Sequence, residues 1–253
     1  MGAIVVGVIT FVCVFGGAIA GMLLRRFIPE HHFSDDSKGA IKMGAGLIAT
    51  LSALVLGLLV NSAKNSFDDM SDSLTQSSAK LIMLDRAMAR YGPQTQPVRQ
   101  MLQSSVVAGI KKYWPENKIN VDTSDFEKAP PTMELVSEKL RELTPQNDTQ
   151  RVFQSEALKL CSEILQNRWL MIEQSQLTLP TAFFVVLIFW LTILFGSIGL
   201  LAPINKTVLI TLFICSISVG GAIFLIEEMN TPLVGFVKVS NAPLIKAVEH
   251  LGK

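Results

Sequence analysis

The chain has 253 residues, 49% of them hydrophobic, with a formal net charge of +1 and a mean hydropathy of +0.42. This composition is too apolar for an ordinary soluble domain and indicates a membrane protein. The nearly neutral charge, without a basic block, argues against nucleic acid as a partner. The three cysteines, Cys13, Cys161 and Cys215, lie far apart without Cys-x-x-Cys spacing, so they predict neither a disulfide framework nor a zinc site.

Four segments lack Asp, Glu, Lys and Arg and are long enough to cross a bilayer, which takes about 20 helical residues. They comprise residues 2–24, 43–63, 174–205 and 207–226. In the first segment Arg25 and Arg26 follow the apolar run, whereas a secretory signal carries its positive charge before the run. The first segment is therefore expected to remain in the membrane as a transmembrane helix.

The connection between the first two spans carries two of the three histidines of the chain, His31 and His32. Ser34 stands where a helix N-cap belongs, and the two aspartates after it fall in the first turn, where carboxylates complement the helix dipole. Adjacent histidines point apart on a helix or strand, and no separated His or Cys completes a ligand set. The sequence therefore favours an interfacial turn, sensitive to pH at about 6, over a metal site.

A heptad pattern continues out of the second span, with intervals of 3, 4, 3, 4, 3, 4 and 3 residues. Its members are Phe67, Met70, Leu74, Ser77, Leu81, Leu84, Met88 and Tyr91. Gly92 and Pro93 then end the helix, so one rod is predicted from Ser34 to Tyr91, about 87 Å long at 1.5 Å per residue. This seam packs either on other helices of the same chain or on a second copy as a coiled coil. The pattern leaves both interpretations open.

The segment between the second and third spans has ordinary soluble composition and predicts a water-exposed helical insert. Its further helices are predicted at about 97–114, shortly after Thr132, and at about 149–176, with a loop rich in Pro, Asn and Asp at 115–131. The chain is thus predicted to divide into spans one and two (1–63), the insert (64–179), spans three and four (180–226) and a tail (227–253). Apolar residues recur often in the tail, so we expect it to pack beneath the spans.

Five motifs, in order, resemble the bacterial bestrophin-like family over nearly the whole chain. They are "GAGLIATLSALVLGLLVNSAKNSFD", "LDRAMARYGP", "NRWLMIEQSQLTLP", "FWLTILFGSIGLLAPIN" and "FLIEEMNTPLVGFVKVSNAPL". Similarity to true bestrophins is weaker and includes a structural turn after the fourth span, where Glu228, Pro232 and Gly235 fit. Leu233 stands where a Phe is expected. No acidic run follows, so the calcium clasp of animal bestrophins is not expected.

The resemblance implies an all-α membrane protein with four transmembrane helices and a large helical insert between the second and third. It implies a homo-oligomer, expected as a pentamer, in which the second spans surround a pore for small inorganic ions, most naturally anions. The protein would lie in the bacterial inner membrane, in contact with the lipid bilayer, with the insert and both termini in the cytoplasm. Neither a cofactor nor catalytic residues are expected, and the chain is not expected to be an enzyme.

One face of the second span turns from small to polar to charged, and Thr50, Gly57, Asn61 and Lys64 are its predicted pore-lining residues. Small residues also let helices approach closely, so simple helix packing is an alternative explanation for this face. A lysine at the membrane exit can equally reach the interface by extending its side chain. Asp68, one turn further on, can pair with Lys64.

Two other functions compete with a channel. One is a non-conducting scaffold or sensor whose insert binds a partner through the heptad seam. The other is a membrane enzyme that uses the turn at His31 and His32 together with Glu30 and Asp35, which the adjacent spacing disfavours. The orientation also has two interpretations, because positive charges flank the first loop and the insert almost equally.

Overall fold

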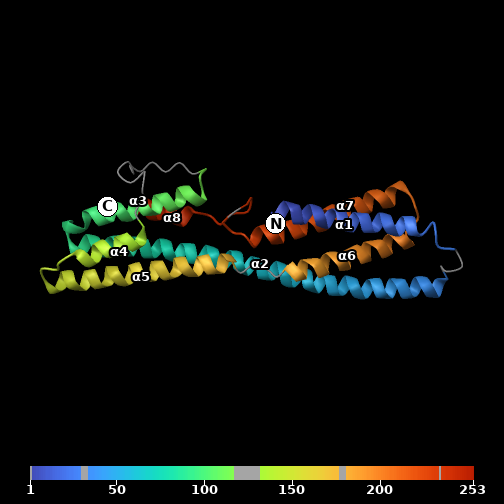
Figure 1. Ribbon diagram of the computed structural model, residues 1–253, viewed down its shortest axis with the longest axis horizontal. Coiled ribbons are helices and arrows are strands. Elements are labelled where there is room, and N and C mark those ends of the chain that lie inside the picture. Colours follow the sequence, from blue (N-terminus) through green and yellow to red (C-terminus); the bar gives the residue numbers. More distant parts are fainter. Residues whose placement is uncertain (1, 30–33, 117–131, 177–180, 234) are drawn as a thin grey trace. The chain divides into compact units, whose positions relative to one another are not determined.

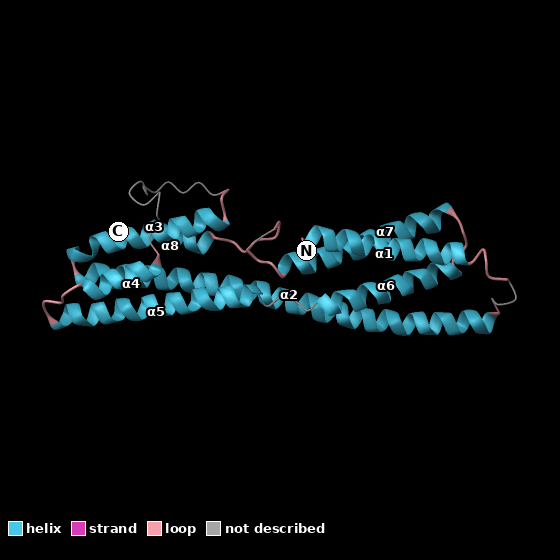
Figure 2. Cartoon of the chain, in the orientation of Figure 1, coloured by secondary structure: helices cyan, strands magenta, loops and turns pink. Residues whose placement is uncertain are grey.

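In a computed structural model of the chain, the residues described are 2–29, 34–116, 132–176, 181–233 and 235–253. These residues form helices and no strand, which confirms the predicted all-α class (Figures 1 and 2). The chain divides into two compact units. We call them the span unit, Met1–Phe67 with Thr178–Val237, and the insert unit, Asp68–Leu177 with Lys238–Lys253. The histidine pair His31 and His32, Glu30 and most of the predicted loop at 115–131 lie outside the described residues.

Four helices in the described part of the chain are long and apolar enough to cross a membrane. They are α1 (Ala3–Leu24), α2 (Asp35–Tyr91), α6 (Thr181–Leu201) and α7 (Lys206–Met229). The start of α2 follows the predicted capping, because the Ser34 hydroxyl accepts a hydrogen bond from the Ser37 amide at 3.2 Å. Helix α2 runs without a break for 57 residues, as the absence of Gly and Pro after Gly57 predicts.

The core of the span unit forms where α1 packs against both α6 and α7. Its most buried side chains include Val14, Leu187 and Ile223, each 0% exposed. Glycines make this close packing possible: a Cβ on Gly21 would collide with the carbonyl oxygen of Gly196 in α6. Since helices in lipid associate through close van der Waals contact, such glycines hold the bundle together.

The insert unit contains the second half of α2 and five shorter elements. They are η2 (Pro93–Thr95), α3 (Gln96–Tyr113), α4 (Met133–Glu142), α5 (Asp148–Gln176) and α8 (Ala242–His250). Six of the eight seam residues are buried within this unit, while Phe67 and Ser77 are half-buried. An ion pair of 3.2 Å between Lys80 of α2 and Glu163 of α5 lies beside them. The heptad seam therefore packs on helices of the same chain, and the coiled coil with a second copy is not needed to explain it.

Helix α2 ends at Tyr91, and the following Gly92 has a φ of +134°, a conformation that favours glycine. The chain turns there into η2, and the Thr95 hydroxyl donates a hydrogen bond of 2.6 Å to the carbonyl oxygen of Met88. The predicted stop at Gly92 and Pro93 therefore coincides with the end of the helix.

The tail is shared between the two units, and whether it packs beneath the spans stays a prediction. Residues up to Val237 belong to the span unit, but Lys238–Lys253 belong to the insert unit. There α8 contacts α3, and the Trp114 indole donates a hydrogen bond of 3.0 Å to the carbonyl oxygen of Val239. The last part of the tail, residues 238–253, is thus a structural part of the insert unit.

Candidate functional site

One side of α2 in the span unit faces the protein core. Leu59 and Ala63 belong to the apolar core and are 4% and 0% exposed. Ser52 lies two turns earlier on the same side and is 3% exposed. These positions define the packed side of α2.

The four predicted pore-lining residues, Thr50, Gly57, Asn61 and Lys64, are all exposed on α2. At about 100° per residue, they fall within about 60° of one another and on the side opposite the packed side. We call this surface the candidate pore face. The structure therefore gathers the four residues on one face and leaves that face uncovered by its own protomer.

The glycines of the candidate pore face do not serve packing within the protomer. Gly46 lies one turn before Thr50 on the same side of α2, and a Cβ added at Gly46 or Gly57 would have no neighbouring atom within 4 Å outside its own helix. By contrast, a Cβ at Gly21 or Gly199 in the α1–α6 contact would collide with a backbone carbonyl. The Thr50 hydroxyl donates to the carbonyl oxygen of Gly46 at 3.0 Å, so its donor is satisfied on its own helix. The small residues of this face are therefore left for a partner copy, lipid or an ion pathway.

A second uncovered surface adjoins the candidate pore face, and we call it the leucine flank. It consists of Met43, Leu47, Leu51, Leu54 and Leu58. Their exposed fractions range from 39% at Leu51 to 79% at Met43. Only 11% of the apolar window of α2 is buried, against 22% to 28% in the other three spans. Of the four membrane-spanning helices, α2 is thus the least buried by its own protomer.

The turn after the fourth span is built around a buried carboxylate. Glu228 is 4% exposed, and its Oε2 accepts hydrogen bonds from the amides of Phe236 at 2.6 Å and Val237 at 3.1 Å. Gly235 has a φ of +109°, and a Cβ there would collide with the Glu228 carboxylate. Pro232 is buried in the same turn. The two backbone donors stabilise the negative charge, which is the role that backbone amides play at many buried carboxylates.

The role of Phe236 and Val237 as donors is not visible in the sequence, because a residue of any type except proline carries a backbone amide N–H. Gly235 was the available signal, since a glycine seven residues after a carboxylate can let the chain return to it. The three residues predicted for this turn are brought together by the structure, with Gly235 against Glu228.

A buried ion pair in the insert unit was also missed. The Arg99 guanidinium donates two hydrogen bonds of 2.8 Å to the carboxylate of Asp85, joining α3 to α2. Their side chains are 9% and 1% exposed. The hydrogen bonds to Asp85 raise the pKa of Arg99 above its ordinary value, against the opposing effect of burial. The role of this pair is structural, because it lies inside the helical unit.

A metal centre has no support in the described ranges, where no group of three or more His, Cys, Asp or Glu side chains could hold an ion. Burial raises the pKa of the Cys161 thiol from 9.0 to about 12, so this cysteine stays protonated and unreactive at neutral pH.

A family model described as the Bestrophin-like domain matches residues 12–244. No curated protein and no solved structure matches the chain.

Proposed function

The chain belongs to the bestrophin-like family, and on this premise we propose that it forms a homo-oligomeric ion channel in the bacterial inner membrane. The candidate pore face of α2 from each copy lines a central pathway, and the leucine flank meets the neighbouring copy. A pentamer is the proposed assembly. The proposal concerns transport and gives the chain no catalytic role.

One observation carries this proposal: α2 turns small and polar residues away from its own protomer. Thr50, Gly57 and Asn61 are exposed on a helix whose opposite side packs on the core. Polar groups are costly toward lipid, so they commonly face a bundle interior or a water-filled cavity. Four spans from one chain are too few to enclose a pore, so several copies must supply the wall.

Lys64 is the proposed source of anion preference. It is exposed at the end of the uncharged stretch of α2, on the candidate pore face. One lysine per copy forms a ring of positive charge, and such rings favour anions. Asp68 lies one turn further along the same face and reduces this charge in proportion to its pairing with Lys64.

The conduction test uses purified protein in planar bilayers under a chloride gradient. We expect channel currents, and we expect Lys64→Glu to shift the reversal potential toward cation preference. Lys80→Glu is a poor control because Lys80 pairs with Glu163. Lys246→Glu makes the same charge change at an exposed position of α8 and is expected to leave the reversal potential unchanged.

The assembly test is native mass spectrometry in mild detergent. A monomer alone, or protein that inserts without conducting, would refute the channel. Equal shifts from Lys64→Glu and Lys246→Glu would remove Lys64 from the pathway. The competing scaffold function is weakened by the burial of the heptad seam, which was its proposed binding surface.

The orientation proposed here places the insert unit and both termini in the cytoplasm, as the family resemblance implies. A reporter fused after Lys253, active only in the cytoplasm or only in the periplasm, tests it. Activity of the periplasmic reporter would reverse the orientation without affecting the proposed pathway along α2.

A further inference from the structure

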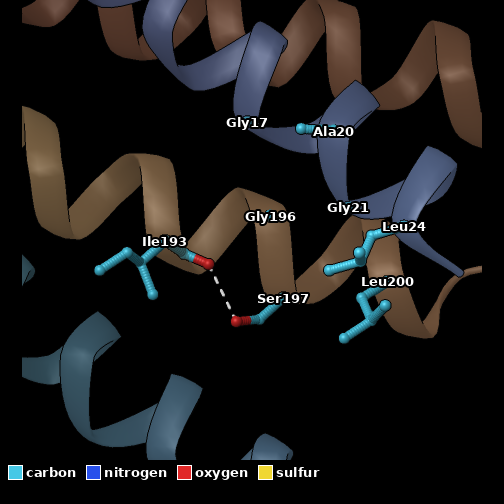
Figure 3. Close-up of a pocket in the computed structure, with 8 residues that line it drawn as sticks. All are labelled: Gly17, Ala20, Gly21, Leu24, Ile193, Gly196, Ser197 and Leu200. Carbon is cyan, nitrogen blue, oxygen red and sulfur yellow. Dashed lines mark hydrogen bonds between the residues drawn. The ribbon is translucent and has the colours of Figure 1, made fainter. Parts of the chain in front are cut away.

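A groove lies on the surface of the span unit between α1 and α6 (Figure 3). Its lining includes the glycines Gly17, Gly21 and Gly196 and the apolar side chains of Leu24, Ile193 and Leu200. The volume is about 430 Å³, within the range of about 300–1,000 Å³ that is typical of small-molecule sites. The groove is therefore large enough for part of a lipid.

The lining of the groove suits an apolar occupant. Among the described residues that line it, only Ser197 has a polar side chain, and its hydroxyl donates to the carbonyl oxygen of Ile193 at 2.9 Å, as Figure 3 shows. The serine thus needs no hydrogen bond from a ligand. A hydrocarbon chain can fill such a groove without leaving a buried polar group unpaired.

The rim of the groove is basic. Leu24 is followed directly by Arg25 and Arg26, both exposed. The Arg25 guanidinium donates to the carbonyl oxygens of Ala202 and Leu201, at 2.5 Å and 3.3 Å, just past the groove residue Leu200. Arg25 thereby offsets the negative end of the α6 dipole.

The surrounding connections keep this end of the span unit positive. The α1–α2 and α6–α7 connections lie at the same end of the bundle (Figure 1). In the sequence, the stretches 25–42 and 202–206 carry five basic residues, Arg25, Arg26, Lys38, Lys42 and Lys206, against the three acidic residues Glu30, Asp35 and Asp36. Asp35 forms an ion pair with Lys38 at 3.6 Å. Within the described ranges Arg26 forms no ion pair with a carboxylate.

We propose that the α1–α6 groove binds an acyl chain of an anionic phospholipid, with the headgroup phosphate at the rim formed by Arg25 and Arg26. The apolar groove and the basic rim are continuous along α1, which matches the arrangement of tail and headgroup in one lipid. Basic pockets between transmembrane helices bind anionic headgroups on the cytoplasmic side of membranes, and the same charge attraction acts on the periplasmic side, where the proposed orientation places this rim.

A second copy of the chain fits the groove less well. Stable protein interfaces bury about 1,200–2,000 Å² in total, whereas this groove is lined by short segments of two helices. The leucine flank of α2 offers a neighbouring copy a longer apolar surface. The net positive charge at the rim would also repel the same rim on a second copy.

The test compares two lipids with the same acyl chains, phosphatidylglycerol and phosphatidylcholine, added to the purified full-length protein in mild detergent. Lipid retained per chain is counted by native mass spectrometry, and the thermal midpoint is recorded in parallel. We expect phosphatidylglycerol to remain bound and to raise the midpoint, and phosphatidylcholine to do neither. We expect Arg26→Gln to weaken phosphatidylglycerol binding about fivefold.

Filling the groove provides the second arm of the test. Ala20 lines the groove and is exposed, so Ala20→Trp should occupy it and abolish lipid retention. Val12, 58% exposed on α1 and outside the groove, gives the matched control Val12→Trp, which should retain lipid.

Three results would overturn the proposal. The first is equal retention of the two lipids, and the second is unchanged lipid retention in Ala20→Trp. The third is a loss of oligomers in Ala20→Trp while lipid is still retained, because that result would make the groove a contact between copies. Should Ala20→Trp fail to fold, the comparison of lipids on the unmodified protein and on Arg26→Gln still decides. None of these results depends on conduction, so the lipid site and the channel can fail separately.

Discussion

The two halves of α2 carry apolar residues for different purposes. In the insert unit Leu84 and Met88 are 0% exposed, because these heptad residues pack on helices of the same chain. In the span unit Leu54 and Leu58 are 62% and 61% exposed on the same helix. One continuous helix thus has a covered half and an open half.

The two halves differ because the insert half is surrounded by water and the span half by lipid. In water, leaving a leucine exposed forgoes about 1.5–3 kcal/mol of burial free energy, so the seam must find a partner. In lipid an exposed leucine carries no such penalty, and apolar residues say little about contacts. The informative residues of a span are therefore small or polar, such as Gly57 and Asn61, because only they distinguish lipid from protein or water.

The largest expected effect tests whether the covered half depends on its buried ion pair. Asp85→Ala leaves the Arg99 cation uncompensated and should lower the free energy of unfolding by about 3–5 kcal/mol. Urea unfolding of the full chain in detergent, followed by circular dichroism, measures it. The control, Asp148→Ala, breaks an ion pair with Arg151 in which the Asp148 side chain is 94% exposed. It should lower the free energy of unfolding by at most about 1 kcal/mol. Similar losses in both variants would contradict the structural role of Asp85.

The second prediction compares one leucine from each half. Leu84→Ala opens a cavity in the insert core and should cost about 2–5 kcal/mol of unfolding free energy. Leu54→Ala, at an exposed position, should leave unfolding of the protomer unchanged and weaken assembly instead. Unfolding curves and native mass spectra separate the two effects. A loss of protomer stability in Leu54→Ala equal to that in Leu84→Ala would contradict the division of α2.

Glycines give a sharper comparison within the membrane. Gly21→Ala should destabilise the bundle by about 1–3 kcal/mol, because its methyl group meets the backbone of α6. Gly57→Ala has open space and should be neutral or stabilise α2 by about 0.5–1 kcal/mol. Thermal unfolding in detergent measures both. Comparable destabilisation by the two changes would show that Gly57 packs within the protomer.

The smallest effect concerns pH. Because burial raises the pKa of Cys161 from 9.0 to about 12, the unfolded chain loses this proton first as the pH rises. The stability that the protonated thiol contributes is complete below pH 9.0 and is lost progressively up to about pH 12, at about 1.4 kcal/mol per unit. Unfolding free energies at pH 8 and pH 10, compared between the unmodified protein and Cys161→Ala, measure this slope. Identical slopes would contradict the raised pKa.

Much of the fold could be predicted from local signals. Ser34 marked the start of α2 and Gly92 its end, because capping depends on the residue at the boundary. The nine residues of α8 were missed, since so short a helix shows little periodicity. The contact of Trp114 with Val239 in the tail was not predicted either, because it joins positions 125 residues apart.

The candidate site was predictable in part. Helical spacing alone places Thr50, Gly57, Asn61 and Lys64 on one face, and the structure adds that this face is uncovered. The environment beyond it depends on neighbours that one chain does not contain. The carboxylate of Glu228 was predicted as structural, but its donors are backbone amides, which every residue except proline supplies.

The divided make-up of the insert unit affects the order in which a ribosome can complete it. Residues 238–253 are synthesised only after the 60 residues of 178–237, which include both later spans. At about 5–20 residues per second, the 125 residues from Trp114 to Val239 take about 6 to 25 seconds, and α3 waits that long for the segment that accepts the Trp114 hydrogen bond. Throughout that interval the nascent insert exposes an unfinished apolar surface, so membrane insertion of α6 and α7 and protection by chaperones must both precede its closure.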